Sequence, residues 1–244
     1  MRVVDGIAGQ AGGVAAIVRD AAARTGTDFS YLMAQARVES GLNPHAQART
    51  SSARGLYQFT NSTWLETVRK HGAAHGLGWA AEAISSGAAR AGSAARETIL
   101  GLRDNAEAAA LMAGEFARDN GERLEARLGR AVGATDLYMA HFLGAGGAAK
   151  FLGVMAAAPA TAAASLMPAA AAANRGVFYR RDGSARSVGE VYARFEAKLG
   201  RGEKPLTLLT ASAVSRPLPQ GERVETANAA RARMAYLLLA ELGG

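Results

Sequence analysis

Glu39 is the residue whose type and position best suit acid–base chemistry. Phe29, Leu32, Ala36 and Glu39 follow one another at spacings of three, four and three residues, which is the spacing of one face of an α-helix. Glu39 therefore shares a helix face with apolar side chains. Because poor hydration favours the protonated form of a carboxyl group, we predict that Glu39 acts as a general acid near neutral pH.

A second block, from Ser51 to Phe59, offers a polar turn opposite the end of this helix. Gly55 permits backbone conformations that other residues avoid, so the turn can approach another group closely. Gln58 carries a neutral amide that both donates and accepts hydrogen bonds.

The two blocks resemble the catalytic core of the lytic transglycosylases, bacterial enzymes with a goose-type lysozyme fold that cleave the glycan strands of peptidoglycan. The family pattern is a glutamate-serine pair, a proline a few residues on, and a glycine-leucine-any-glutamine block. Here these elements are Glu39-Ser40, Pro44 and Gly55-Leu56-Tyr57-Gln58, in the correct order. The alternative is a structural glutamate, buried at a helix end and held by neighbouring backbone amides.

The resemblance implies a mechanism with a single carboxylate, without metal or cofactor. Glu39 would protonate the β-1,4 glycosidic oxygen between N-acetylmuramic acid (MurNAc) and N-acetylglucosamine (GlcNAc), and would then help the C6 hydroxyl of MurNAc to close a 1,6-anhydro ring. Most other glycosidases use two carboxylates. Asp28 lies at the far end of the predicted helix, about 16 Å away by helical rise, so it cannot be a partner.

The same resemblance suggests substrate-binding roles around Glu39. Ser40 would order Glu39, and the turn that contains Ser52 and Gly55 would let the backbone approach the sugar. Tyr57 would stack on a sugar ring or pack in the interior, and Gln58 would contact the glycan. The ordinary alternatives are a polar helix end for Ser40 and a surface turn for the loop.

A third family element, alanine-tyrosine-asparagine-alanine-glycine, corresponds to Ala140 through Gly144 and departs from the pattern. His141 replaces the tyrosine that would face the cleft, and Phe142 replaces the asparagine. His141 could donate a hydrogen bond in its place, Tyr138 could supply the hydroxyl one turn earlier, and Tyr192 is a further candidate. Each of the three is otherwise a core residue.

Helical periodicity dominates the rest of the chain, which predicts an all-α, goose-type lysozyme-like fold with at most a small β-hairpin near Leu56 to Phe59. A helix should open near Asn61, with Asn61 or Ser62 as its cap. Further helices are expected at 14–25, 105–120, 121–128, within 132–151 and after Ser187. The domain prediction is a lysozyme-like domain over 1–199, a flexible linker over 200–221 and a terminal helix over 222–244.

The charge of the chain points to an anionic partner. The net charge is +7 and the isoelectric point is about 10.1. Peptidoglycan, whose stem peptides carry carboxylates, satisfies this, whereas no zinc-finger, basic-zipper or RNA-recognition pattern supports nucleic acid. The chain has no cysteine, which excludes disulfides and thiolate metal sites.

The segment that begins at Met1 does not resemble a secretory signal, because Asp5 and Gln10 interrupt its apolar residues. The uncharged run 151–174 is mostly alanine and contains two prolines, so we predict no transmembrane helix. We expect a periplasmic or cell-envelope monomer. The expected partner is the glycan strand, and the process served could be a flagellar, secretion or phage apparatus or the routine turnover of the wall.

A zinc site receives little support. His71 and His75 are four residues apart, but they lack the intervening glutamate and third ligand of a zinc protease.

The alternatives to the lyase are a hydrolytic lysozyme and a lysozyme-like module that binds glycan without cleaving it.

Overall fold

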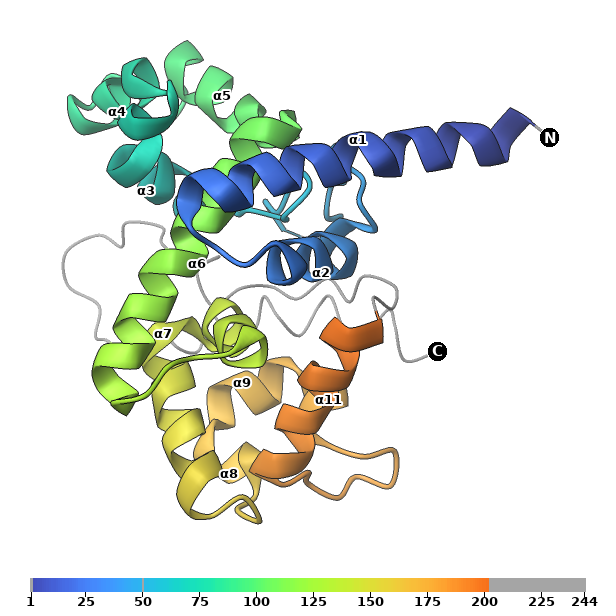
Figure 1. The fold of residues 1–244 in the computed structure, drawn as a ribbon. Helices are drawn as coiled ribbons and strands as arrows, with labels where there is room; N and C mark the ends of the chain where they lie inside the picture. Colours follow the sequence, from blue (N-terminus) through green and yellow to red (C-terminus); the bar gives the residue numbers. More distant parts are fainter. Residues whose placement is uncertain (1, 50, 202–244) are drawn as a thin grey trace. The chain divides into compact units, whose positions relative to one another are not determined.

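The computed structural model describes residues 2–49 and 51–201, which are mainly helical (Figure 1). They form two compact units. The N-terminal unit contains Met1–Ala48 and Ser52–Asp119, and the C-terminal unit consists mainly of Asn120–Arg201. The all-α fold class predicted from the sequence is confirmed for the described residues.

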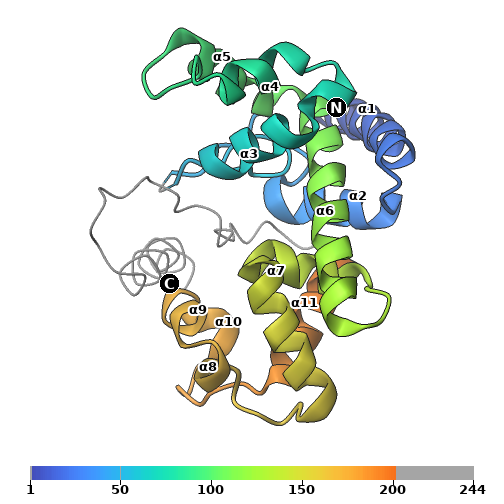
Figure 2. The same ribbon diagram turned by 90° about the vertical axis from the view of Figure 1, so that its left-hand side faces the viewer.

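The N-terminal unit holds the candidate catalytic helix. Its elements are α1 (Arg2–Thr25), α2 (Phe29–Ser40), α3 (Asn61–His71), η1 (Gly72–His75), α4 (Gly78–Ser85), α5 (Ala94–Gly101), η2 (Leu102–Asp104) and the first part of α6 (Ala106–Leu128). The helix α1 packs against α2, and α3 contacts both α4 and α5 (Figure 2).

The ends of α2 follow the predicted local signals. The Oδ1 atom of Asp28 accepts a hydrogen bond from the Tyr31 backbone N–H at 2.7 Å, as an N-cap should. At the other end, Gly41 adopts the left-handed conformation with φ of 61°. Its N–H donates to the Arg37 carbonyl at 3.0 Å, which ends the helix.

The cap of α3 lies one residue earlier than predicted. Thr60 is the N-cap, and its hydroxyl oxygen accepts a hydrogen bond from the Thr63 N–H at 3.3 Å. The predictions of Asn61 or Ser62 as the cap were therefore wrong. Asn61 is the first residue of the helix, and because threonine and asparagine are both good caps, neighbouring candidates cannot be separated by type alone.

A tryptophan fixes the arrangement of α3 and α5. Trp64 is fully buried, and its indole Nε1–H donates to the Ile99 carbonyl at 2.7 Å. Its ring also meets Phe59 edge-on, with the ring centroids 5.3 Å apart. The residue after the Gly55–Gln58 turn is thereby anchored in the core of the N-terminal unit.

The C-terminal unit is built around α7 (Ala134–Ala157) and α11 (Val188–Arg201), which pack together. Short helices α8 (Ala163–Leu166), α9 (Pro168–Ala173) and α10 (Arg175–Phe178) lie between them in sequence. Gly144 interrupts α7 with a φ of 72° and a ψ of 156°. Ser187 caps α11 as predicted, because its hydroxyl accepts from the Glu190 N–H at 3.2 Å.

Other boundaries differ from those predicted. The helices expected at 105–120 and 121–128 are one continuous helix, α6. The expected hairpin is reduced to isolated antiparallel bridges from Arg54 to Gln47 and to Phe59, and no strand occurs in the described parts of the chain. None of the described helices is long and apolar enough to cross a membrane. Residues 202–244, where most of the predicted linker and the terminal helix fall, lie outside the described residues.

Candidate functional site

Glu39 lies in the last turn of α2 and is only 2% exposed. Leu32 and Ala36, which share its predicted helix face, are fully buried. The expected burial of the Glu39 carboxyl group on an apolar helix face is therefore confirmed. Such a group is suited to proton transfer in a water-poor environment.

Two tyrosines link Glu39 to the second sequence block electrostatically. Burial raises the pKa of Tyr31, and the negative charge of Glu39 raises it further. Burial likewise raises the pKa of Tyr57, with a smaller contribution from Tyr31. The hydroxyl of Tyr57 is buried without a hydrogen-bond partner among the described residues. Both phenols are therefore neutral and protonated at physiological pH.

Ser40 connects the end of α2 to the Gly55–Gln58 turn. Its hydroxyl lies 2.8 Å from the Leu56 carbonyl and 3.0 Å from the Ala36 carbonyl, and it donates to this pair of acceptors. The contact with Leu56 joins residues 16 positions apart in the sequence. Ser40 thus holds the loop beside the helix turn that carries Glu39, which gives the glutamate-serine pair a structural meaning.

Gly55 is required by a close backbone contact. Its φ is +83°, and a Cβ atom at this position would lie 2.0 Å from the carbonyl oxygen of Arg103. In this structure the turn closely approaches the backbone of Arg103, and the approach to a sugar that the resemblance implies stays a prediction. No other residue type fits without moving one of the two backbones.

The side chain of Gln58 holds the turn together. Its Nε2 donates to the Gly55 carbonyl at 2.9 Å and to the Ala46 carbonyl at 3.1 Å, and the residue is 4% exposed with a φ of +49°. Tyr57 is 1% exposed and packs in the interior. The Ser52 hydroxyl accepts a hydrogen bond from the Asn61 N–H at 3.2 Å. These contacts give all three residues a structural role within the loop.

Arg103, which the sequence did not single out, clamps this loop. It is 5% exposed, and its Nη1 donates to the Ser52 carbonyl at 2.6 Å and to the Phe59 carbonyl at 3.0 Å. Its Nε donates to the Leu100 carbonyl at 2.8 Å. Burial, and next the nearby charge of Arg54, lower the pKa of Arg103 to about 10. No motif surrounds this arginine, so the sequence contained no signal for it.

An ion pair lies beside the clamp. The Arg54 guanidinium binds Asp104 through two contacts, of which Nε to Oδ1 measures 2.6 Å and the other joins Nη2 to Oδ2. The hydrogen bond from Arg54 holds the pKa of Asp104 below its usual range, although burial opposes this. Asp104 is therefore an ionised carboxylate engaged by arginine.

The remaining predicted site residues belong to the C-terminal unit and make their contacts there. Tyr138 is fully buried and stacks on His141, with ring centroids 5.7 Å apart. The Lys198 ammonium donates to the Tyr138 hydroxyl at 3.4 Å. Tyr192 donates to Asp136 Oδ1 at 3.0 Å, and burial followed by this carboxylate raises the pKa of Tyr192 to about 12. Tyr138 and Tyr192 thus join α7 to α11, and His141 packs on Tyr138 within α7.

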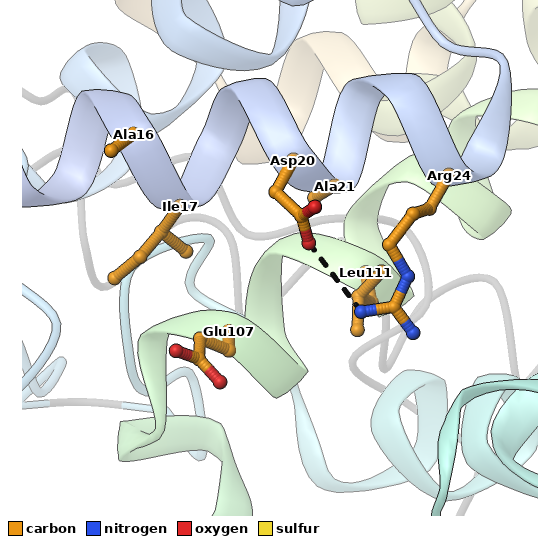
Figure 3. Close-up of a pocket in the computed structure, with 7 residues that line it drawn as sticks. All are labelled: Ala16, Ile17, Asp20, Ala21, Arg24, Glu107 and Leu111. Carbon is orange, nitrogen blue, oxygen red and sulfur yellow. Dashed lines mark hydrogen bonds and ion pairs between the residues drawn. The ribbon is translucent and has the colours of Figure 1, made fainter.

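A surface hollow of about 260 Å³ lies between α1 and α6 (Figure 3). Asp20 and Arg24 form an ion pair of 3.4 Å along one side, and Glu107 lies on the other. The full lining consists of Ala16, Ile17, Asp20, Ala21, Arg24, Glu107 and Leu111. It contains no residue of the two sequence blocks, so it is separate from the candidate site.

His71 and His75, whose sequence spacing gave little support for a zinc site, belong to an ionic cluster. His75 Nε2 lies 2.7 Å from Glu115, and His71 Nε2 lies 3.0 Å from Asp119. Lys70 also donates to Asp119, at 2.7 Å. Within the described part of the chain, no group of three or more histidine, cysteine, aspartate or glutamate side chains is arranged to hold a metal ion. The cluster joins α3 and η1 to α6.

Comparison with known families gives a match to the Transglycosylase SLT domain over residues 16–78. The matched segment contains Glu39, Ser40 and the Gly55–Gln58 turn, whereas Arg103 and the C-terminal unit lie outside it. The match therefore falls on the residues that carried the resemblance in the sequence. Residues 16–78 are therefore similar to the Transglycosylase SLT domain, which is consistent with a lytic transglycosylase of the lysozyme-like superfamily.

Proposed function

We propose that this protein is a peptidoglycan lytic transglycosylase that cleaves the β-1,4 bond between MurNAc and GlcNAc and leaves 1,6-anhydro-MurNAc ends. The observation that carries the proposal is the position of Glu39. This carboxyl group is buried at the end of α2, beside a loop that Ser40 attaches to the same helix turn, and it lies in the segment that matches the SLT domain.

In the proposed reaction Glu39 acts first as an acid and then as a base. Its proton passes to the glycosidic oxygen as the bond from that oxygen to C1 of MurNAc breaks, which releases the GlcNAc hydroxyl. The resulting carboxylate then accepts the proton of the MurNAc C6 hydroxyl while the C6 oxygen bonds to C1. Glu39 regains its proton and no water is consumed, so the reaction is formally that of a lyase.

A mechanism with one carboxylate agrees with the state of two other acidic residues of the N-terminal unit. Asp28 is the N-cap at the opposite end of α2. Asp104 is held by Arg54, which keeps its pKa low and its oxygens engaged. Neither carboxylate is suited to be the second group that a two-carboxylate glycosidase requires.

The proposed substrate also agrees with the charge of the chain. A protein of net charge +7 is attracted to a polymer whose stem peptides carry carboxylates. We propose that the protein works in the cell envelope, on glycan strands, as a monomer. Service to a flagellar, secretion or phage apparatus is part of this proposal.

A module that binds glycan without cleaving it is the second candidate function. The observation that favours it is the altered third element, in which His141 and Phe142 are buried inside the C-terminal unit. The retained Glu39 favours the enzyme.

Digestion of purified sacculi, followed by mass spectrometry of the soluble products, tests the proposal. We expect muropeptides that end in 1,6-anhydro-MurNAc. Products with reducing ends would instead indicate a hydrolase. Binding without release of soluble fragments would indicate the non-catalytic module.

A further inference from the structure

We propose that Arg103 is a positioning residue for the proposed transglycosylase site. Its role would be to fix the shape of the loop from Ser52 to Phe59, which packs against the end of α2. The inference rests on the proposed function, and it concerns a residue outside the segment that matches the SLT domain.

The guanidinium of Arg103 closes the loop at both ends. One nitrogen, Nη1, donates to the carbonyls of Ser52 and Phe59, which are the first and last residues of the loop. A second nitrogen, Nε, donates to Leu100 and holds the side chain against α5. A planar guanidinium can serve three carbonyls in fixed directions, which a lysine ammonium on a flexible stem cannot do.

The backbone of Arg103 supports the middle of the loop. Its carbonyl occupies the space that a Cβ atom of Gly55 would need, so the turn is seated directly on this residue. The adjacent pair of Arg54 and Asp104 ties the loop to η2 a second time. Arg103 therefore meets the loop at both ends through its side chain and at the centre through its backbone.

The clamp reaches Glu39 through Leu56. The Leu56 carbonyl accepts from Ser40, which follows Glu39 in the chain. A shift of the loop would therefore disturb the turn of α2 that carries the acid. Because a misplacement of about 1 Å can slow an enzyme by about 10²-fold, a small shift is enough to matter.

Arg103→Lys tests this role, because it keeps the charge and loses the fixed geometry. The control is Thr27→Val, which removes a hydrogen bond of 3.0 Å to the Gly114 carbonyl elsewhere in the same unit. Two quantities are measured: the exchange of the loop amides of Arg54, Gly55 and Gln58 with solvent deuterium, and the rate of release of soluble fragments from sacculi. If the lysine variant does not fold, Arg103→Gln replaces it, because its neutral amide also lacks the guanidinium geometry.

We expect the loop amides to exchange at least about tenfold faster in Arg103→Lys than in Thr27→Val, and kcat to fall at least about tenfold with a smaller change in half-saturation. Unchanged loop exchange would overturn the proposal. So would faster exchange with a turnover equal to that of the control. If the wild-type protein releases nothing, the proposed function fails instead, and binding to sacculi then replaces turnover as the second measurement.

Discussion

At the scale of single residues, the motif around Glu39 joins chemistry to architecture. Glu39 supplies the proposed acid. The contacts of Ser40 attach the loop to α2, and those of Gly55 and Gln58 hold the loop in its shape. The sequence drew attention to these residues, because their order and spacing form a pattern. It could not predict their partners, since a hydroxyl or amide can meet a sugar or a carbonyl equally well.

Ser40→Ala should destabilise the protein and slow it. The variant leaves the Leu56 carbonyl without its donor, which typically lowers the free energy of unfolding by about 1–3 kcal/mol for a buried group. Ser30→Ala, an exposed change on the same helix, is the matched control. Chemical denaturation measures the free energy of unfolding, and sacculus digestion measures the rate. If Ser40→Ala and Ser30→Ala had the same free energy of unfolding and the same rate, the account would be contradicted.

Tyr57→Phe should leave stability unchanged or raise it by up to about 1 kcal/mol, because the buried hydroxyl that it removes has no partner among the described residues. Thermal unfolding beside Thr27→Val, which loses an existing hydrogen bond, provides the comparison. A loss of stability as large as that of the control would show that the Tyr57 hydroxyl is hydrogen-bonded in solution.

At the scale of elements, local signals were predictable and distant contacts were not. Asp28 and Gly41 bound α2 because capping depends on neighbouring residues. Arg103 escaped prediction because its carbonyl partners lie 44 and 51 residues away. The cluster that joins α3 and η1 to α6 escaped for the same reason, since the partners of His71 and His75 are 48 and 40 residues distant.

This cluster should make the N-terminal unit sensitive to acid. Burial opposes the charge of Glu115 and Asp119, but hydrogen bonds from His75 and Arg118, and from His71 and Lys70, hold the pKa of each carboxyl below its usual range. A lowered pKa in the folded state stabilises the fold above the unfolded pKa, and this contribution is lost as the pH falls through the folded value.

We therefore expect the wild-type protein to lose stability as the pH falls below about 4. Glu115→Gln should be less stable than wild type at pH 6, and the difference should shrink toward pH 3. Thermal unfolding at the two pH values measures this. A difference that is the same at both would mean that the carboxylate of Glu115 contributes nothing through its charge.

At the scale of the whole molecule, the family match covers only residues 16–78, and the described chain divides into two compact units. The resemblance was strongest where the sequence keeps the family pattern, around Glu39. It was least informative at Tyr138, His141 and Tyr192, which contact other side chains of the C-terminal unit. Aromatic residues at helical spacing could not be assigned to core or site from sequence, because both uses leave the same pattern.

The net charge of +7 should make binding to sacculi depend on salt. With the Glu39→Gln variant, used so that the polymer is not digested, we expect the bound fraction in a pelleting assay to fall steeply between about 0.02 and 0.5 M NaCl, because salt screens exposed charges. Binding that does not change over this range would show that the net charge has no part in recognition.

The central claim, that Glu39 is the proton donor, is tested most directly by Glu39→Gln on purified sacculi. The amide is nearly the same shape but cannot supply the proton, so the variant should release anhydro-ended fragments at least about 10²–10⁴-fold more slowly while circular dichroism shows an intact fold. Glu66→Gln, a change at an exposed carboxylate on α3, should digest sacculi at the wild-type rate. Release by Glu39→Gln at a rate near that of Glu66→Gln would contradict the account.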